Sequence, residues 1–205
     1  MTPAARRRLR LSPAERRAAI LAAAARVFRR RGYAAATVTH VVKEAKVSRG
    51  TFYAHFDSKR RLLAALAGDL LDRILPRFPS TPVLGTRDDL LAALCASARI
   101  ALEGVAREPV IARLVLGGGI GSEPAALRLL AAHDASWKRL VLALLQRARA
   151  AKLLRDGVDL DAAAELIVGS SERAVRALAM RAAPPATVEP IASRLADLQA
   201  AAVAR

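Results

Sequence analysis

The sequence predicts an all-α protein, and three observations lead to this prediction. Apolar residues recur at helical spacing through most of the 205 residues, no stretch alternates with the period of a β-strand, and Ser, Thr or Asp stands where helices would begin. A hydrophobic content of 54% is ample for a buried core. The predicted architecture is an N-terminal three-helix domain with a helix-turn-helix, followed by a larger helical domain.

The first predicted helix follows a basic segment. Residues 1–11 contain four arginines and no acid, which predicts a disordered basic arm that either follows a polyanion or serves as a solubilising tail. Residues 12–15, Ser-Pro-Ala-Glu, have the pattern of a capping box with proline at the first helical position, and Gly32 ends the helix. Its apolar stripe consists of Ile20, Ala24, Val27 and Phe28.

Residues 37–61 predict two short helices joined by a tight turn. Thr37 is the expected N-cap of the first, and Ser48 that of the second, which covers residues 49–55. Phe52 and Phe56 are spaced to point inward together. The surface left to the second helix carries Arg49, Gly50, Thr51, Tyr53 and His55.

That surface combines a bidentate guanidinium donor, a glycine that allows close backbone approach, a hydroxyl with a methyl group, and a phenol. Such groups suit base edges, thymine methyls and phosphates in a DNA major groove. The alternative is a small helical hairpin with an ordinary solvated face.

Charge is concentrated in the same part of the chain. Residues 1–62 hold 16 of the 34 Lys and Arg but three of the 18 Asp and Glu, so they carry +13 of the net +16. This asymmetry indicates a polyanionic partner. RNA or a membrane surface could attract the same charge, and a genome rich in Arg and Ala codons could contribute to it, but none of these explains the side chains at 49–55.

A set of anchors at fixed spacing runs through the first third of the chain: Ile20-x7-Phe28-x3-Gly32, then Thr37-Val38, then Ala45-x-Val47-Ser48-x-Gly50-Thr51-x-Tyr53-x-His55-Phe56-x-Ser58-Lys59-x-x-Leu62. This pattern resembles the DNA-binding domain of the tetracycline-repressor (TetR) family of bacterial regulators. Two positions depart from it. Lys46 replaces a turn glycine, which implies strain at positive φ or a different turn, and Val42 replaces an alanine.

The resemblance implies a DNA-binding domain over residues 12–58 and an effector-binding and dimerisation domain over 59–205. Expected base contacts are Arg49, Thr51 and Tyr53, with Thr39 as an addition and Gly50 allowing close approach. The residues expected to hold phosphates are Thr37, Lys43, Ser48, His55 and Lys59.

Helical patterns continue through the rest of the chain. The predicted helices cover residues 59–76, 86–108, 110–116, 124–154 and 159–183, with a last one from 187, and residues 78–85 form a loop. The glycine-rich run at 117–121 is either a phosphate cradle or a flexible connection, and the second is favoured because no strand precedes it.

The resemblance further implies that the last two helices form a four-helix interface with a second copy. Internal core packing is the alternative for the same residues. The expected interface residues are Leu160, Ala164, Ile167, Ser171, Ala174, Leu178, Ile191, Leu195 and Leu198.

The resemblance also implies a pocket for a small apolar effector, of lipophilic or acyl type, in the C-terminal domain. Polar or aromatic breaks in its Leu- and Ala-rich helices are the candidate lining, although each also suits plain core or surface. These candidates are Cys95, Arg99, Leu116, His133 and Trp137.

Other classes of protein have little support in the sequence. No apolar run is long enough for a membrane span, no signal peptide is evident, and the single cysteine, Cys95, fits a reducing cytoplasm. None of the three histidines has the spacing of a metal or catalytic site, so no cofactor is expected. We therefore expect a homodimeric repressor that binds a palindromic operator in double-stranded DNA; the alternative is an architectural protein that coats DNA by charge alone.

Overall fold

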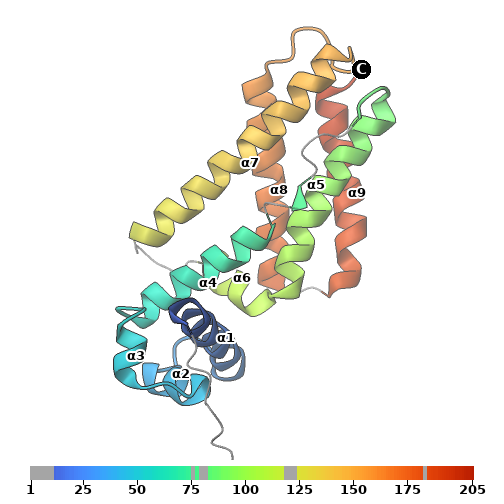
Figure 1. The fold of residues 1–205 in the computed structure, drawn as a ribbon. Coiled ribbons are helices and arrows are strands. Elements are labelled where there is room, and N and C mark those ends of the chain that lie inside the picture. The colour runs from blue at the N-terminus through green and yellow to red at the C-terminus, as the bar shows by residue number, and fades with distance from the viewer. Residues whose placement is uncertain (1–11, 75–76, 79–82, 118–123, 182–183) are drawn as a thin grey trace, which may run out of the picture. The chain divides into compact units, whose positions relative to one another are not determined.

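The computed structural model describes residues 12–74, 77–78, 83–117, 124–181 and 184–205. The described residues form α-helices, one short 3-10 helix and an isolated bridge between Leu154 and Ala204 (Figure 1). The all-α prediction is therefore confirmed. The basic arm at 1–11 and most of the glycine-rich run at 117–121 lie outside the described residues.

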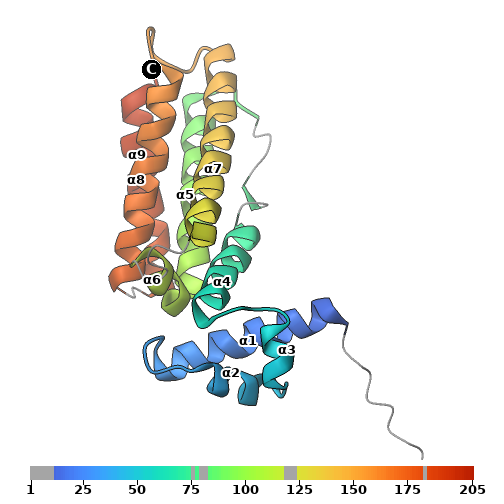
Figure 2. The same ribbon diagram turned by 90° about the vertical axis from the view of Figure 1, so that its left-hand side faces the viewer.

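The chain divides into two compact units, residues 1–62 and 63–205. The first contains α1 (Pro13–Arg31), α2 (Val38–Ala45) and α3 (Arg49–Tyr53), and α4 (Lys59–Ile74) begins in it (Figure 2). α1 packs on α2, and α2 contacts α3. The core of this unit is built from fully buried Ile20, Phe28, Val41 and Phe52.

The helix starts follow the local sequence. Ser12 and Glu15 form the predicted capping box, in which the Glu15 backbone N–H donates to Ser12 Oγ at 3.2 Å. Hydrogen bonds from Ser12 hold the pKa of the Glu15 carboxyl below its usual value. Thr86 and Asp89 form the same motif at the start of α5. A cap satisfies backbone donors that the first helical turn leaves unpaired, which is why these residues fix where each helix begins.

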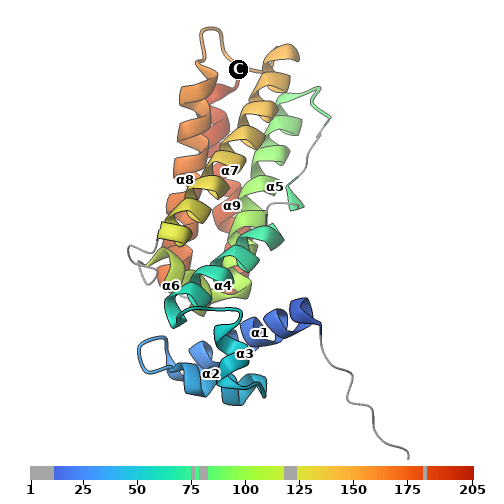
Figure 3. The same cartoon turned by 60° about the vertical axis from the view of Figure 1, so that its left-hand side comes forward.

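The second unit is a bundle of longer helices: α5 (Arg87–Arg107), α6 (Pro109–Leu116), α7 (Pro124–Ala150), α8 (Leu160–Arg181) and α9 (Val188–Val203), with the 3-10 helix η2 (Pro185–Thr187) before the last. α5 packs against α8 and α9, and these three helices lie side by side (Figures 1 and 2). α7 and α6 each pack on α8 (Figure 3). Leu90, Leu94, Leu102 and Leu145 are fully buried between them.

Two helices end earlier than the sequence predicted. α3 stops at Tyr53 rather than His55, because the His55 N–H donates to Phe52 O at 2.9 Å in a tighter turn. α7 stops at Ala150 rather than Leu154. Lys152 adopts a positive φ of 59°, and the Leu153 N–H donates to Ala148 O at 2.9 Å. This turn closes the helix and sends the chain toward Leu154, which pairs with Ala204.

Candidate nucleic-acid interface and ligand pocket

The α2–turn–α3 segment is fixed by caps at both helix starts. Thr37 and His40 form a capping box in which His40 Nδ1 accepts the Thr37 backbone N–H at 3.2 Å, a role more often filled by Glu or Gln. At the start of α3, Ser48 Oγ accepts the Thr51 backbone N–H at 3.0 Å. The Ser48 and Thr51 hydroxyls also pair at 2.9 Å. The hydroxyls of Thr37, Ser48 and Thr51 are therefore engaged locally.

Lys46 forms the turn between the two helices. Its φ of 55° and ψ of 40° lie in the left-handed region that glycine favours. The turn therefore keeps this backbone conformation although lysine stands in place of glycine. The following Val47 N–H donates to Val42 O at 3.1 Å and closes the end of α2. The cost of placing a side chain in this region is roughly 1–2 kcal/mol.

α3 is anchored from behind by aromatic side chains. Phe52 is fully buried, Phe56 is nearly so, and their ring centroids lie 5.9 Å apart. The opposite surface is open: Arg49 and Gly50 are exposed, and Tyr53 keeps 48% of its surface in solvent. A five-residue helix has little stability of its own, so the two buried phenylalanines hold this surface in place.

A Cβ added at Gly50 would meet only Ser48 Oγ, at 3.7 Å, which is an ordinary van der Waals contact. The fold of this unit therefore does not require glycine there. Thr39 and Lys43 on α2 are also exposed, whereas Thr51 and His55 are half-buried. The sequence-predicted DNA contacts on α2 and α3 thus come from two adjacent short helices.

Lys59 has a different environment from the one expected. Its ammonium group donates to the carbonyls of Tyr33 at 2.8 Å, Ala34 at 3.3 Å and Ala36 at 2.8 Å, and it lies 4.4 Å from the centre of the Tyr33 ring. An ammonium group has three N–H donors, and three carbonyls accept them here. These bonds engage the ammonium group expected to hold a phosphate, and they tie the start of α4 to the α1–α2 connection.

Two acidic side chains in this unit, Glu15 and Glu44, are committed to structural contacts. Glu44 on α2 pairs with Arg26, at 2.7 Å, and with Arg30, both on α1. These hydrogen bonds hold the pKa of the Glu44 carboxyl below its usual value. Lys43, Lys46 and Arg49 remain on the exposed surface of the helix-turn-helix. A concentration of exposed cations beside a protruding short helix has the electrostatic character of a nucleic-acid surface.

The second unit contains a cavity of about 170 Å³ between α4, α5, α6, α7 and α8. Three of the five candidate effector residues line it, namely Leu116, His133 and Trp137. The other two do not. From α5, the residues that line the cavity are Ala101 and Val105, which lie one turn apart. Cys95 and Arg99 lie on another side of that helix. The remaining lining residues are Ala67, Leu70, Leu71, Ile74, Phe78, Ala112, Val115, Leu130, Glu172, Val175 and Arg176.

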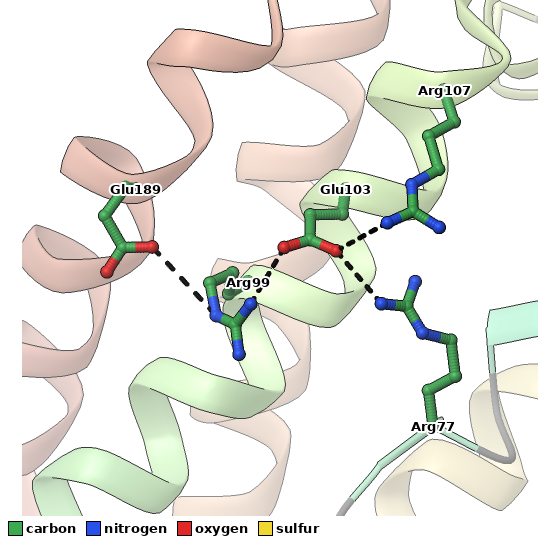
Figure 4. A network of polar contacts seen from close by, with 5 residues as sticks. All are labelled: Arg77, Arg99, Glu103, Arg107 and Glu189. Carbon is green, nitrogen blue, oxygen red and sulfur yellow. Dashed lines mark hydrogen bonds and ion pairs between the residues drawn. The ribbon is translucent and has the colours of Figure 1, made fainter.

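Arg99 belongs instead to a network of ion pairs (Figure 4). Its guanidinium donates to Glu103 at 2.9 Å and lies 4.0 Å from Glu189 on α9. Glu103 also accepts from Arg77 at 3.0 Å and Arg107 at 3.2 Å (Figure 4). These bonds lower the pKa of the Glu103 carboxyl against the opposing effect of its burial. The network joins the segment after α4, α5 and α9.

The cavity has a mostly apolar wall and a few polar groups. The Trp137 ring lies 5.7 Å from Phe78 and 6.1 Å from His133. His133 Nδ1 is buried without a hydrogen-bond partner, and burial lowers the pKa of the imidazole. Burial raises the pKa of the Glu172 carboxyl, with Arg176 acting against that shift. The sequence analysis did not include Glu172 and Arg176 among the lining residues. The sequence feature that could have indicated them is an opposite-charge pair at i and i+4 on either side of the buried Val175.

The residues expected at a dimer interface divide into two groups by their burial within the chain. Ala164, Ile167, Ser171 and Leu178 are buried within the chain itself, because this side of α8 packs on neighbouring helices. Gln199 of α9 is also buried. Its side-chain amide donates to Ile167 O at 3.1 Å and to the hydroxyls of Ser170 and Ser171 at 3.0 Å. The other five expected residues, Leu160, Ala174, Ile191, Leu195 and Leu198, are half-buried or exposed.

A different apolar face of α8 and α9 is open. Leu166 and Met180 on α8 keep 48% and 43% of their surface exposed, and Leu198 on α9 keeps 70%. Gly169 and Arg173 lie between Leu166 and Met180 at helical spacing. Isolated exposed leucines are common on protein surfaces, but large exposed apolar side chains on two helices that pack together suit association with another surface.

Two kinds of feature are absent from the part of the chain that the structure describes. There, no three or more His, Cys, Asp or Glu residues are grouped so that they could ligate a metal ion. Within the same ranges, none of the helices has both the length and the apolarity needed to cross a bilayer.

The fold and the surface of the first unit define a helix-turn-helix protein with a C-terminal helical bundle. Residues 20–66 match the family model of bacterial regulatory proteins of the tetR family. Over 72 residues the chain is 42% identical to the HTH-type transcriptional regulator EthR of Mycolicibacterium smegmatis. That alignment covers 35% of this chain and 33% of EthR, so the chain spans about a third of the length of this relative. Residues 20–66 therefore match the family that the sequence pattern resembled.

Solved structures share the fold of the whole chain. A TetR-family regulator from Mesorhizobium loti superposes with a TM-score of 0.72 at 19% identity, covering 96% of this chain and 100% of that one. SmeT, the repressor of the Stenotrophomonas maltophilia multidrug efflux pump SmeDEF, gives 0.70 at 23% identity, covering 92% and 90%. SmeT also matches as its complex with triclosan. At these identities the likeness establishes the fold.

Proposed function

We propose that this protein is a sequence-specific DNA-binding transcriptional regulator, acting as a homodimeric repressor on a palindromic operator. The observation that carries the proposal is the α3 surface. Arg49, Gly50 and Tyr53 are exposed on a short helix whose buried phenylalanines fix it from behind, in a unit that carries most of the net positive charge. Because its partner is chromosomal DNA, we place the protein in the cytoplasm.

Within this proposal α3 reads bases in the major groove. The Arg49 guanidinium suits a guanine edge, and the exposed Tyr53 hydroxyl suits a base or a phosphate. The Thr51 hydroxyl is paired with Ser48, so we assign its methyl group to a thymine methyl. Thr39 adds a contact from α2. Thr37, Lys43, Ser48 and His55 hold phosphates, and Lys59 supports the fold rather than the DNA.

The proposed dimer uses the open face of α8 and α9. Leu166, Met180 and Leu198 form its apolar centre, and Ile191 and Leu195 contribute their exposed edges. A two-fold dimer would present two α3 helices to successive major grooves, which requires a separation of about 34–36 Å between them. The operator would then be a pseudo-palindrome with matching half-site spacing.

Release from DNA is proposed to follow ligand binding in the cavity of the second unit. A ligand can shift the protein between DNA-binding and released arrangements only if it binds the two with different affinity. The apolar lining and the few polar groups of the cavity suit a small organic effector. That SmeT has been captured with triclosan adds support from a structural neighbour.

We propose a regulator rather than an enzyme. Ser171 of α8 would be a nucleophile in a hydrolytic enzyme, but its hydroxyl is engaged in a structural contact. The Ser171 hydroxyl donates to Ile167 O at 2.7 Å and accepts from Gln199 at 3.0 Å, which places it in a buried helix contact. Nucleophilic catalysis would require a base within hydrogen-bonding reach of that hydroxyl.

The experiment that tests the DNA-reading role compares Arg49→Ala with Lys43→Ala. Arg49→Ala should cost about 1–3 kcal/mol at one operator base pair and flatten the preference there. Lys43→Ala should weaken all sequences alike and reduce the salt slope by about one. Arg87→Ala removes an exposed arginine of the second unit and is the matched control, expected to bind as the parent does. Uniform loss in both test variants would refute the assignment of base reading to Arg49.

A further inference from the structure

The size of the cavity restricts its ligand. A cavity of about 150 Å³ lined by aliphatic and aromatic side chains is known to accept benzene. The cavity here measures about 170 Å³ and is lined mainly by aliphatic and aromatic side chains. It therefore matches one six-membered ring with a small substituent, and not the long acyl chain that the sequence alone left open.

The wall of the cavity favours an aromatic ring. Trp137 is 4% exposed and its ring lies at 58° to Phe78 and 60° to His133, so three rings form one side of the space. Aromatic pairs in offset or edge-to-face arrangements contribute beyond the area that they bury. Leu70, Ile74 and other aliphatic side chains complete the lining.

His133 offers a polar atom that can fix the orientation of the ligand. His133 lines the cavity, and its Nδ1 is buried with no hydrogen-bond partner. A buried polar atom without a partner is unfavourable, and a ligand that supplies a hydrogen bond removes that cost. Because burial lowers the pKa of His133, the imidazole is neutral near pH 7 and its unprotonated nitrogen can accept a hydrogen bond.

The surrounding charge opposes an anionic ligand. Asp72 and Asp134 both act electrostatically on His133, and Asp134 and Glu165 act on Glu172, which itself lines the cavity. Arg176 is the one cation among the described lining residues, set against these four acidic groups, and it donates to the carbonyl of Leu116. A carboxylate would enter this acidic environment at a cost, whereas an uncharged hydroxyl would not.

We propose that the cavity binds an uncharged single-ring phenol, with the ring against Trp137 and Phe78 and the hydroxyl donating to His133 Nδ1. The role of this ligand as an effector rests on the proposed regulatory function. Its binding to the cavity does not.

The test uses the fluorescence of Trp137, the chain's only tryptophan, so that quenching reports on this cavity. The full-length protein, without DNA, is titrated with p-cresol, toluene and benzoate. p-Cresol and toluene differ by one hydroxyl, and one hydrogen bond corresponds to roughly a five- to tenfold difference in affinity. We expect saturable quenching by p-cresol at five- to tenfold lower concentration than by toluene, and none by benzoate.

His133→Leu removes the acceptor and keeps an apolar side chain. It should bring p-cresol to the affinity of toluene while toluene still binds, which shows that the cavity persists. His133→Gln retains an acceptor and should keep part of the preference, and it serves if the leucine variant fails to fold. Arg128→Leu, an exposed position on the same helix, is the matched control and should keep the full preference.

Equal affinity of the parent protein for p-cresol and toluene, tighter binding of benzoate, or a preference that survives in His133→Leu would each overturn the proposal. These outcomes are separable from failure of the regulatory function. Titration without DNA reports on the cavity alone, and operator binding without ligand reports on the DNA-reading unit alone.

Discussion

Replacement of Lys59 by methionine separates a structural role from a phosphate-binding one. Methionine keeps most of the length of the side chain but removes the ammonium, its bonds to the Tyr33, Ala34 and Ala36 carbonyls and its contact with the Tyr33 ring. A hydrogen bond from a charged donor contributes about 1.5–3 kcal/mol, and a cation–π contact about 0.5–1 kcal/mol. Because the ammonium is only partly buried, we expect a net loss of about 2–4 kcal/mol in the free energy of unfolding.

The assay is denaturant unfolding of the full-length protein, followed by the salt dependence of DNA binding for the same variant. Lys43→Met, at an exposed position of α2, is the matched control and should unfold as the parent does while its salt slope falls by about one. Lys59→Met should show the reverse, with reduced stability and an unchanged slope. Parental stability together with a lower slope in Lys59→Met would refute the structural role and restore the phosphate contact.

Three further predictions concern single positions. Lys46→Gly should raise the free energy of unfolding by about 0.5–1 kcal/mol in denaturant titrations, because glycine adopts the positive φ without strain. The larger entropy of the unfolded glycine variant offsets only part of this gain, and a destabilised variant would contradict the prediction. Gly50→Ala should melt at or above the parental temperature, since the added Cβ meets no close atom, yet lose operator affinity at least tenfold in gel-shift titrations; unchanged affinity would show that the DNA does not approach this backbone. The free energy of unfolding of the parent should fall as pH drops below about 6.5, because the imidazole of His133 protonates in the unfolded chain before it does in the buried site. This group should contribute at most about 1.4 kcal/mol per pH unit to the fall. His133→Gln should lack that contribution in unfolding curves measured from pH 7.5 to 5, and an identical acid slope would argue against a neutral buried imidazole.

The helix starts could be predicted from sequence because capping is local. Ser12, Thr37, Ser48 and Thr86 each bond to a backbone N–H three residues further on, so a short window of sequence contains the whole interaction. The same is true of the Phe52 and Phe56 pair that anchors α3. The all-α fold and the surface of the helix-turn-helix followed from these local patterns.

Interactions over longer separations could not be predicted in the same way. The carbonyl partners of Lys59 lie 23 to 26 residues earlier in the chain, and no periodicity indicates that an ammonium would reach them. On α8 the 3.6-residue period identified an apolar stripe correctly but did not reveal what covers it. The stripe through Ile167 and Leu178 faces the chain's own core, and the face with Leu166 is open.

Some residues of the cavity could be predicted from local sequence and others could not. His133 and Trp137 line the cavity and interrupt runs of leucine and alanine, whereas Arg99 interrupts such a run for another reason, its ion pairs with Glu103 and Glu189. Polarity within an apolar helix indicates that a side chain has a special environment. Which environment it has depends on the neighbouring helix, which the local sequence does not specify.

The most direct test of the whole account is a footprint on DNA from around the protein's own gene, at physiological salt with excess nonspecific competitor. Sequence-specific reading by a dimer should give a bounded, two-fold symmetric protected site, with half-sites about one helical turn apart or a multiple of that distance. Protection that spreads without boundaries and disappears as salt is added would contradict sequence-specific reading by α3. It would favour a protein that coats DNA through charge alone.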